Sequence, residues 1–265
     1  MDYEEKKFKT NDLVLTYQEW GMSQGDKPTI ITLHGFGVSG HMYDEFSRRY
    51  QDTARIINLD QRGHGDSEIS EVGNYQRSAF VSDVEGLRIH LGLQNFILVG
   101  HSMAGIVIPK VAEKIPERLA HLVFLSAFIL KDGESLLDNC PEEQQGLFGQ
   151  LASESPDNTV MFPEEVFLEF FANGMDIDEA KKVYRKLTPT PYHPYIQKLD
   201  LKKFYSMDLP MSYIFCKQDK ALPDGWWHPK MSSRIKHAYA EIDTCHEVMF
   251  SKPEACAEKI IQMAG

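Results

Sequence analysis

Cysteine is scarce in this sequence, with four residues in 265: Cys140, Cys216, Cys245 and Cys256. Their spacing matches neither a zinc-ligand pattern nor a Cys-x-x-Cys redox motif, so we expect free thiols and no metal site. Cys216 lies in an apolar segment and is expected to be a small core residue. Cys245 stands next to His246, but neighbours on an extended segment point in opposite directions, which disfavours Cys245 as a nucleophile.

Long apolar runs are also missing. None approaches the roughly 20 residues that span a bilayer, and the charged stretch 1–15 lacks the apolar region of a secretory signal. We therefore expect a cytoplasmic protein without membrane contact.

Positive charge is in deficit, with 28 Lys and Arg against 39 Asp and Glu and a formal net charge of −11. This balance opposes binding to nucleic acid and to anionic membranes. The expected partner is a small molecule, and the chain is expected to be a monomer or a homodimer.

Short apolar runs alternate with helix-like stretches along most of the chain. Alternating polarity over 13–18 predicts an opening strand that belongs to a hairpin. Further strands are predicted at Thr29–Leu33, Arg55–Leu59, Phe96–Val99, Leu122–Leu125 and Met211–Phe215. Helical patterns cover Tyr75–Leu91, Ile106–Ile115 and Pro253–Met263. This order predicts an α/β fold with a doubly wound, mostly parallel sheet.

The alternation stops between residues 128 and 199. Acidic helical segments replace the strands, at Glu164–Asn173 and Ile177–Leu187, and a cluster of prolines and aromatics follows at 189–195. We interpret 128–199 as a helical cap inserted into one core domain formed by 1–127 and 200–265.

The segment Gly100-His-Ser-Met-Ala104 resembles the Gly-x-Ser-x-Gly motif of a nucleophile elbow, with alanine at the second glycine position. An apolar strand runs into Ser102 and a helical stretch runs out of it, which is the strand–turn–helix context that the elbow requires. Taken alone, Ser102 is equally compatible with an ordinary helix N-cap.

Two upstream motifs favour catalysis. Leu33-His-Gly-Phe-Gly37 follows a predicted strand, and its backbone can turn N–H groups towards a substrate. The N–H groups of Phe36 and Met103 are therefore the predicted oxyanion hole. The second motif, residues 60–67, is glycine-rich and is interpreted as scaffold.

A serine nucleophile needs a base and a group that orients the base. Among ten histidines, His246 follows a strand-like run and precedes the last helix, so it can reach the edge where Ser102 lies. Asp219 follows the strand Met211–Phe215 and is the predicted acid. Asp224 and Asp243 are rivals, although Asp243 is too close to His246 in sequence to face it easily.

With these residues in view, the chain resembles the α/β-hydrolases over nearly its whole length. It is most similar to the branch of plant methylesterases, hydroxynitrile lyases and their bacterial relatives. The matching stretches are Leu33–Gly37, Asp60–Ser67, Val99–Gly105, Asp219–Pro223 and His246–Pro253. The lyases of this branch lack a histidine before the serine, so His101 favours an esterase. They use a lysine near the acid, a position that Lys220 does not clearly match.

The resemblance implies a cofactor-free serine hydrolase of a carboxylic ester or lactone, with Ser102, His246 and Asp219 as the triad. Aromatic residues suggest a bulky apolar substrate, for example a macrolactone carrying a cationic amino sugar. The predicted substrate-binding residues are His34, Phe128, Phe162, Phe171, Tyr192, Tyr195, Trp226 and Trp227. The alternatives are a lyase or C–C hydrolase on the same triad, and a ligand receptor with a hydrolase fold.

Overall fold

The computed structural model describes residues 3–21 and 27–264 and is built around an eight-stranded sheet. The strands are β1 (Tyr3–Lys9), β2 (Val14–Trp20), β3 (Thr29–Leu33), β4 (Arg55–Leu59), β5 (Phe96–His101), β6 (Leu119–Leu125), β9 (Met211–Cys216) and β10 (Ala238–Ile242). Their order is β1-β2-β4-β3-β5-β6-β9-β10. The pairs β1–β2 and β2–β4 are antiparallel, whereas every later pair is parallel. The predicted fold class is confirmed.

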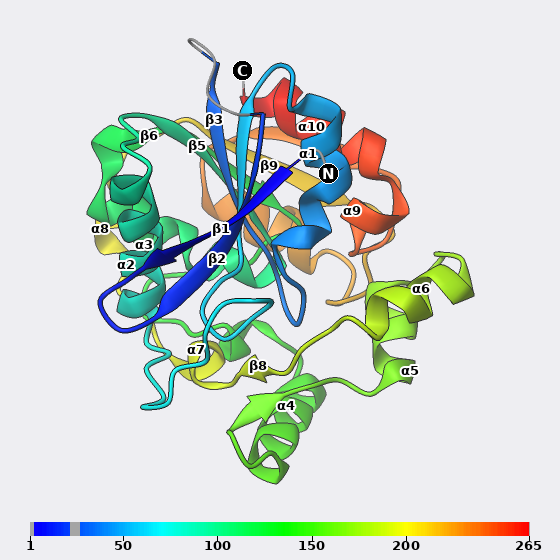
Figure 1. Cartoon of the computed structure of the whole chain (residues 1–265). Helices are drawn as coiled ribbons and strands as arrows, with labels where there is room; N and C mark the ends of the chain where they lie inside the picture. The colour runs from blue at the N-terminus through cyan, green and yellow to red at the C-terminus, as the bar shows by residue number, and fades with distance from the viewer. Residues whose placement is uncertain (1–2, 22–26, 265) are drawn as a thin grey trace.

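Helices cover both faces of this sheet (Figure 1). One face carries α2 (Arg77–His90), α3 (Ile108–Lys114) and α8 (Lys202–Tyr205), and the other carries α1 (Asp44–Tyr50), α9 (Val248–Ser251) and α10 (Pro253–Ala264). Side chains of β5 alternate between the two apolar layers: Leu98 belongs to the cluster that contains Val84 of α2, and Val99 to the cluster that contains Phe46 of α1. Burial on both faces explains why the parallel strands are apolar throughout.

Short turns complete the core. They are η1 (Gly40–Tyr43), η2 (Ser102–Ile106), η3 (Pro116–Arg118), η6 (Trp226–Met231) and η7 (Ser232–Arg234). None of the helices among the described residues is long and apolar enough to cross a membrane.

The segment between β6 and β9 forms the insertion. It contains η4 (Leu137–Asn139), α4 (Glu142–Glu154), β7 (Thr159–Val160), α5 (Glu164–Val166), η5 (Phe167–Phe171), α6 (Ile177–Tyr184), β8 (Thr190–Pro191) and α7 (His193–Ile196). The sequence predicted helices alone, but β7 and β8 pair as a two-residue antiparallel ladder that is too short to leave a sequence pattern. The division into core and cap at residues 128 and 199 stays a prediction.

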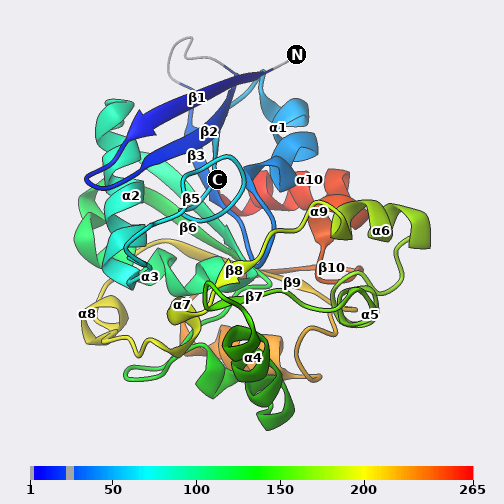
Figure 2. The ribbon, with the colours of Figure 1, turned by 60° about the horizontal axis from the view of Figure 1, so that its bottom comes forward.

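The insertion gathers at one end of the sheet, as Figures 1 and 2 show. The loops that follow β3, β5, β9 and β10 carry Phe36, Ser102, Asp219 and His246. Because parallel strands present their carboxyl ends at one edge, these four residues are brought to the same edge.

Candidate active site

Ser102 lies in the sharp turn where β5 ends and η2 begins. Its φ angle of 53° falls in the left-handed region, which residues other than glycine rarely adopt. The chain packs tightly around it: a Cβ on Gly100 would lie 2.4 Å from Ile108 Cδ1, and one on Gly105 would lie 2.1 Å from the carbonyl oxygen of Phe128. A strained, closely packed turn of this kind projects the serine hydroxyl away from the sheet.

The loop after β3 approaches Ser102 from the neighbouring strand. A Cβ on Gly35 would lie 2.9 Å from Ser102 Cβ, so only glycine allows this approach. Phe36, the next residue, lines the same cavity as Ser102 and Met103. This proximity is what an oxyanion hole requires of its two backbone donors, and that role for Phe36 and Met103 stays a prediction.

His246 and Asp219 form a buried pair. His246 Nδ1 donates to Asp219 Oδ2 at 2.5 Å, and the N–H of Ala221 donates to Asp219 Oδ1 at 2.9 Å. Burial opposes the charged imidazolium, but the Asp219 carboxylate outweighs it, so the pKa of His246 is raised above its ordinary value. With Nδ1 protonated, Nε2 of the neutral ring is free to accept a proton.

The rival carboxylates lie elsewhere. Asp243 is exposed and accepts from Gln218 Nε2 at 3.1 Å, and Asp224 is exposed on the loop after Pro223. Of the three candidates, Asp219 is the one in contact with His246.

Three rings hold the imidazole of His246. His101, the residue before Ser102, lies 4.5 Å away between ring centroids, Trp227 stacks at 5.4 Å with an interplanar angle of 23°, and Phe171 meets it edge-on at 5.5 Å. Burial and the neighbouring His246 hold the pKa of His101 well below its ordinary value. The neutral His101 ring therefore donates from Nε2 to the carbonyl oxygen of His246 at 3.0 Å, which ties the base to the end of β5.

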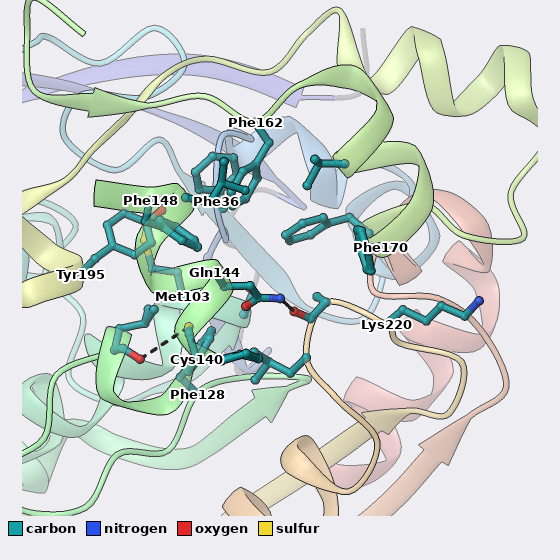
Figure 3. Close-up of a pocket in the computed structure, with 18 of the residues that line it drawn as sticks. Phe36, Met103, Phe128, Cys140, Gln144, Phe148, Phe162, Phe170, Tyr195 and Lys220 are labelled. Carbon is teal, nitrogen blue, oxygen red and sulfur yellow. Dashed lines mark hydrogen bonds between the residues drawn. The ribbon is translucent and has the colours of Figure 1, made fainter. Parts of the chain in front are cut away.

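A cavity of about 440 Å³ opens beside Ser102. Five predicted substrate-binding residues line it: Phe128, Phe162, Phe171, Tyr195 and Trp227. Figure 3 shows Phe36, Phe148, Phe162 and Tyr195 gathered on one side. The ring centroids of Phe36 and Phe162 are 4.5 Å apart. The wall is therefore aromatic and is shared between core and insertion.

Comparisons with known proteins agree with this geometry. A family profile described as "alpha/beta hydrolase fold" matches residues 28–154. A solved extracellular α/β-hydrolase from a Paenibacillus species, described as sharing structural and functional homology with tobacco salicylic acid binding protein 2, is 30% identical with a TM-score of 0.83. That match covers 89% of this chain and 98% of the other. The chain belongs to the α/β-hydrolase family.

Two further relatives are more distant. A thermophilic esterase from Thermogutta terrifontis shares the fold at 21% identity and a TM-score of 0.77, over 98% of this chain and 97% of its own. The putative chloroplastic methylesterase 11 of Arabidopsis thaliana is 23% identical over 225 residues, which is 81% of this chain. The chain spans 58% of the length of that plant relative. The predicted resemblance to α/β-hydrolase esterases is confirmed.

Three predicted substrate-binding residues of this α/β-hydrolase do not line the cavity. His34, the first residue of the loop after β3, has a buried side chain. Its Nδ1 donates to the Gly35 carbonyl and its Nε2 accepts from the Gln61 N–H. Tyr192 stacks on Tyr195 from outside the lining. Trp226 lies under the ammonium group of Lys230, 3.2 Å from its ring centroid. Their role in substrate binding stays a prediction, and their positions show that sequence proximity to a motif does not fix the direction of a side chain.

The sequence analysis also missed several residues that line the cavity. Gln144 lies four residues before Phe148 on α4, so helical spacing from that aromatic residue would have found it, and Leu147 lines the cavity from the same helix. Cys140 lines the cavity from the turn before α4, and Lys220 and Leu222 from the loop after Asp219. Nothing in the sequence marks Cys140, because its position depends on how the insertion folds back over the core.

One group of possible metal ligands exists among the described residues. The ligand atoms of Glu5, His41 and Asp66 lie within 4.8 Å of one another. None of the three lines the cavity beside Ser102, so this group takes no part in the geometry described above. That the protein works without a cofactor stays a prediction.

Proposed function

We propose that this protein is a serine esterase that hydrolyses a carboxylic ester or lactone through an acyl-enzyme. The observation that carries the proposal is the strained Ser102 at the cavity wall, at the same sheet edge as the buried His246–Asp219 pair. In the proposed reaction, Ser102 Oγ attacks the ester carbonyl while His246 Nε2 takes its proton. Asp219 holds the tautomer with Nδ1 protonated and stabilises the imidazolium that forms.

The next step expels the alcohol. The N–H groups of Phe36 and Met103 stabilise the tetrahedral oxyanion, and His246 gives its proton to the leaving alkoxide. Water, deprotonated by His246, then attacks the acyl-Ser102 ester and releases the carboxylic acid. Ser102 regains its proton from His246, so the enzyme returns to its starting state.

The lining supports a bulky, apolar substrate. Apart from Glu143, Gln144 and Lys220, most residues that face the cavity are aromatic or aliphatic. Its volume lies within the roughly 300–1,000 Å³ of drug-sized binding sites. A macrolactone with a cationic amino sugar remains the most specific proposal, with Glu143 as the acidic residue at the cavity that would attract the sugar.

Covalent labelling of the nucleophile tests the proposal. After reaction with a fluorophosphonate, intact-mass analysis should show one adduct, mapped to Ser102, and no adduct on Ser102→Ala. A panel of esters and lactones of rising size should then give acid products. Labelling of another residue, with full turnover by Ser102→Ala, would reject the serine esterase.

A second candidate has one observation in its favour. Lys220 lines the cavity directly after the acid, and a lysine near the acid is a feature of the lyases in this branch. Incubation with cyanohydrins separates the two, because a lyase releases cyanide and an aldehyde or ketone, whereas the proposed esterase releases none.

A further inference from the structure

Arg77, the first residue of α2, is a buried cation without a counter-charge. It is 2% exposed, and its Nη2 donates to the carbonyl oxygen of Pro194 at 3.0 Å. Nε and Nη1 have no hydrogen-bond partner, and the side chain forms no ion pair with any carboxylate in residues 3–21 and 27–264. Burial lowers the pKa of Arg77 to about 9, which still leaves it charged at neutral pH.

A second buried arginine shows how unusual this is. Arg62 is 1% exposed and bonds Asp83 at 2.6 Å and Asp12 at 3.1 Å, so two carboxylates balance its charge. A buried charge is costly unless it is paired. The Arg77 guanidinium lies over the Phe80 ring, with Cζ 5.3 Å from its centroid, but a ring carries no counter-charge. The missing carboxylate therefore points to an anion that comes from outside the chain.

Arg77 forms part of the wall of a basic cleft of about 460 Å³. The cleft lies between α2, α3 and the segment 197–203 that leads into α8, elements that lie together on one flank of the sheet (Figures 1 and 2). Its charged lining consists of Arg77, Lys110, Lys114, Lys198 and Lys203, against Glu113 and Asp200. Five cations against two acids form a local excess of positive charge in a chain of net charge −11.

Two of the four lysines in this cleft already have a protein partner, because Lys110 and Lys203 both bond Glu113. The other two are free to bind a ligand. Lys114 and Lys198 are exposed, and neither forms a hydrogen bond or ion pair with a described residue. The amino end of α2 adds partial positive charge: Gln197 Oε1 accepts from the Arg77 N–H at 2.6 Å, and Ser78 of the first turn lines the cleft.

We propose that this cleft binds a phosphate-type oxyanion. Lys114 and Lys198 contact the anion from the rim, and Arg77 supplies the buried positive charge that the anion balances. The volume exceeds that of a lone phosphate, so a phosphate monoester fits the same site. The site is distinct from the cavity beside Ser102, and its occupation does not depend on esterase activity.

Calorimetric titration at low, constant ionic strength tests the proposal, with inorganic phosphate and AMP as probes. The wild-type chain should bind at least one of them at a single site. The probe that binds with the lower Kd shows whether the site prefers free phosphate or a phosphate monoester. The double variant Lys114→Gln, Lys198→Gln should bind that probe at least about tenfold more weakly, because two charge-assisted contacts are lost.

A matched control removes the same net charge elsewhere. Lys7 and Lys9 are exposed on β1 and neither lines this cleft, so Lys7→Gln, Lys9→Gln should keep the affinity within about twofold. As a second measurement, the probe should raise the melting temperature of the wild type and not that of Arg77→Met. The proposal fails if neither anion binds the wild type, if the control pair weakens binding equally, or if the Lys114 and Lys198 variant binds normally.

Discussion

Strand β5 and the insertion after β6 meet at the same cavity but are built differently. Every residue of β5 is buried, and the strand pairs in parallel register with β3 and β6. Within the insertion, the strand pairing is limited to the two-residue ladder of β7 and β8. The insertion meets the core through rings, such as Phe162 against Phe36, and through single hydrogen bonds, such as that from the Thr188 N–H to the Gly37 carbonyl at 2.7 Å. Backbone pairing fixes the nucleophile, whereas apolar packing shapes the space around it.

Three hydrogen bonds join the insertion to the loops that carry the acid and the base. Gln144 Nε2 donates to the Ala221 carbonyl at 3.0 Å, and Asn173 Nδ2 donates to the Gln218 carbonyl at 2.7 Å. In sequence, these two carbonyls flank Asp219 and Lys220. The Phe171 carbonyl accepts from the N–H of Glu247, the residue after His246, at 3.2 Å. Elements with few such bonds open more easily than a sheet. We therefore expect the core to carry the chemistry and the insertion to influence substrate choice.

The largest effect should come from the core. Ser102→Ala should reduce kcat by about 10⁴- to 10⁶-fold, on the scale of triad deletions, because no other group can form the acyl-enzyme. The melting temperature should stay close to that of the wild type, since only one hydroxyl is removed. Steady-state kinetics and calorimetry check both, and Ser102→Gly should be more stable than Ser102→Ala because glycine tolerates a φ of 53°.

The next largest effect should come from the acid. Asp219→Asn should lower kcat by about 10⁴-fold, because an amide cannot hold the tautomer of His246 with Nδ1 protonated. Asp243→Asn is the matched control and should stay within about twofold, since Asp243 bonds Gln218 at the surface. If the two variants ranked in the opposite order, the wrong carboxylate would have been assigned to the base.

The same contrast explains how far the sequence could be interpreted. Strands β3, β4 and β5 begin and end within two residues of their predicted positions, because local apolar runs bounded by turns determine them. The elbow was found because the strand, the serine and the close-packed glycines are contiguous in the chain. The Asp219–His246 contact followed from the order of strands and loops, although 27 residues separate the two.

Predictions for the insertion were less complete. Its helix at Ile177–Tyr184 was expected, and Asp176 caps it by accepting from two backbone N–H groups, Asp178 and Glu179. The predicted helix at 164–173 is instead a short α5 followed by the π-helical η5. Which aromatic residues face the cavity depends on packing between segments far apart in sequence, so the sequence could not tell that Tyr195 lines the cavity and Tyr192 does not.

Substrate choice should change when the insertion is altered. Tyr195→Leu removes a ring from the cavity wall and should lower kcat/KM for a bulky ester about tenfold relative to a small activated ester. Tyr192→Leu is the control, because Tyr192 stacks on Tyr195 from outside the lining. Equal losses on both esters in Tyr195→Leu would show that the aromatic wall is structural and does not select substrates.

A smaller effect concerns pH. The base must be neutral, and the pKa of His246 is raised, so kcat/KM should fall on the acid side at a higher pH than an ordinary histidine would give. Burial raises the pKa of the adjacent Glu247 to about 7, and its ionised form favours the imidazolium. Glu247→Gln should therefore move the acid limb to lower pH by less than about one unit. A shift to higher pH would contradict this coupling.

The smallest effect should be on the motion of the insertion. Gln144→Leu removes the bond from α4 to the Ala221 carbonyl but keeps a side chain of similar size at the cavity (Figure 3). One lost hydrogen bond contributes about 1 kcal/mol, so hydrogen exchange in α4 should become about fivefold faster while exchange in β5 stays unchanged. Gln150→Leu is the control on the same helix, because Gln150 bonds Glu154 at the surface. Since Ala221 donates to Asp219, loosening this loop should also lower kcat slightly. If both variants exchange alike, the Gln144 bond does not hold the insertion closed.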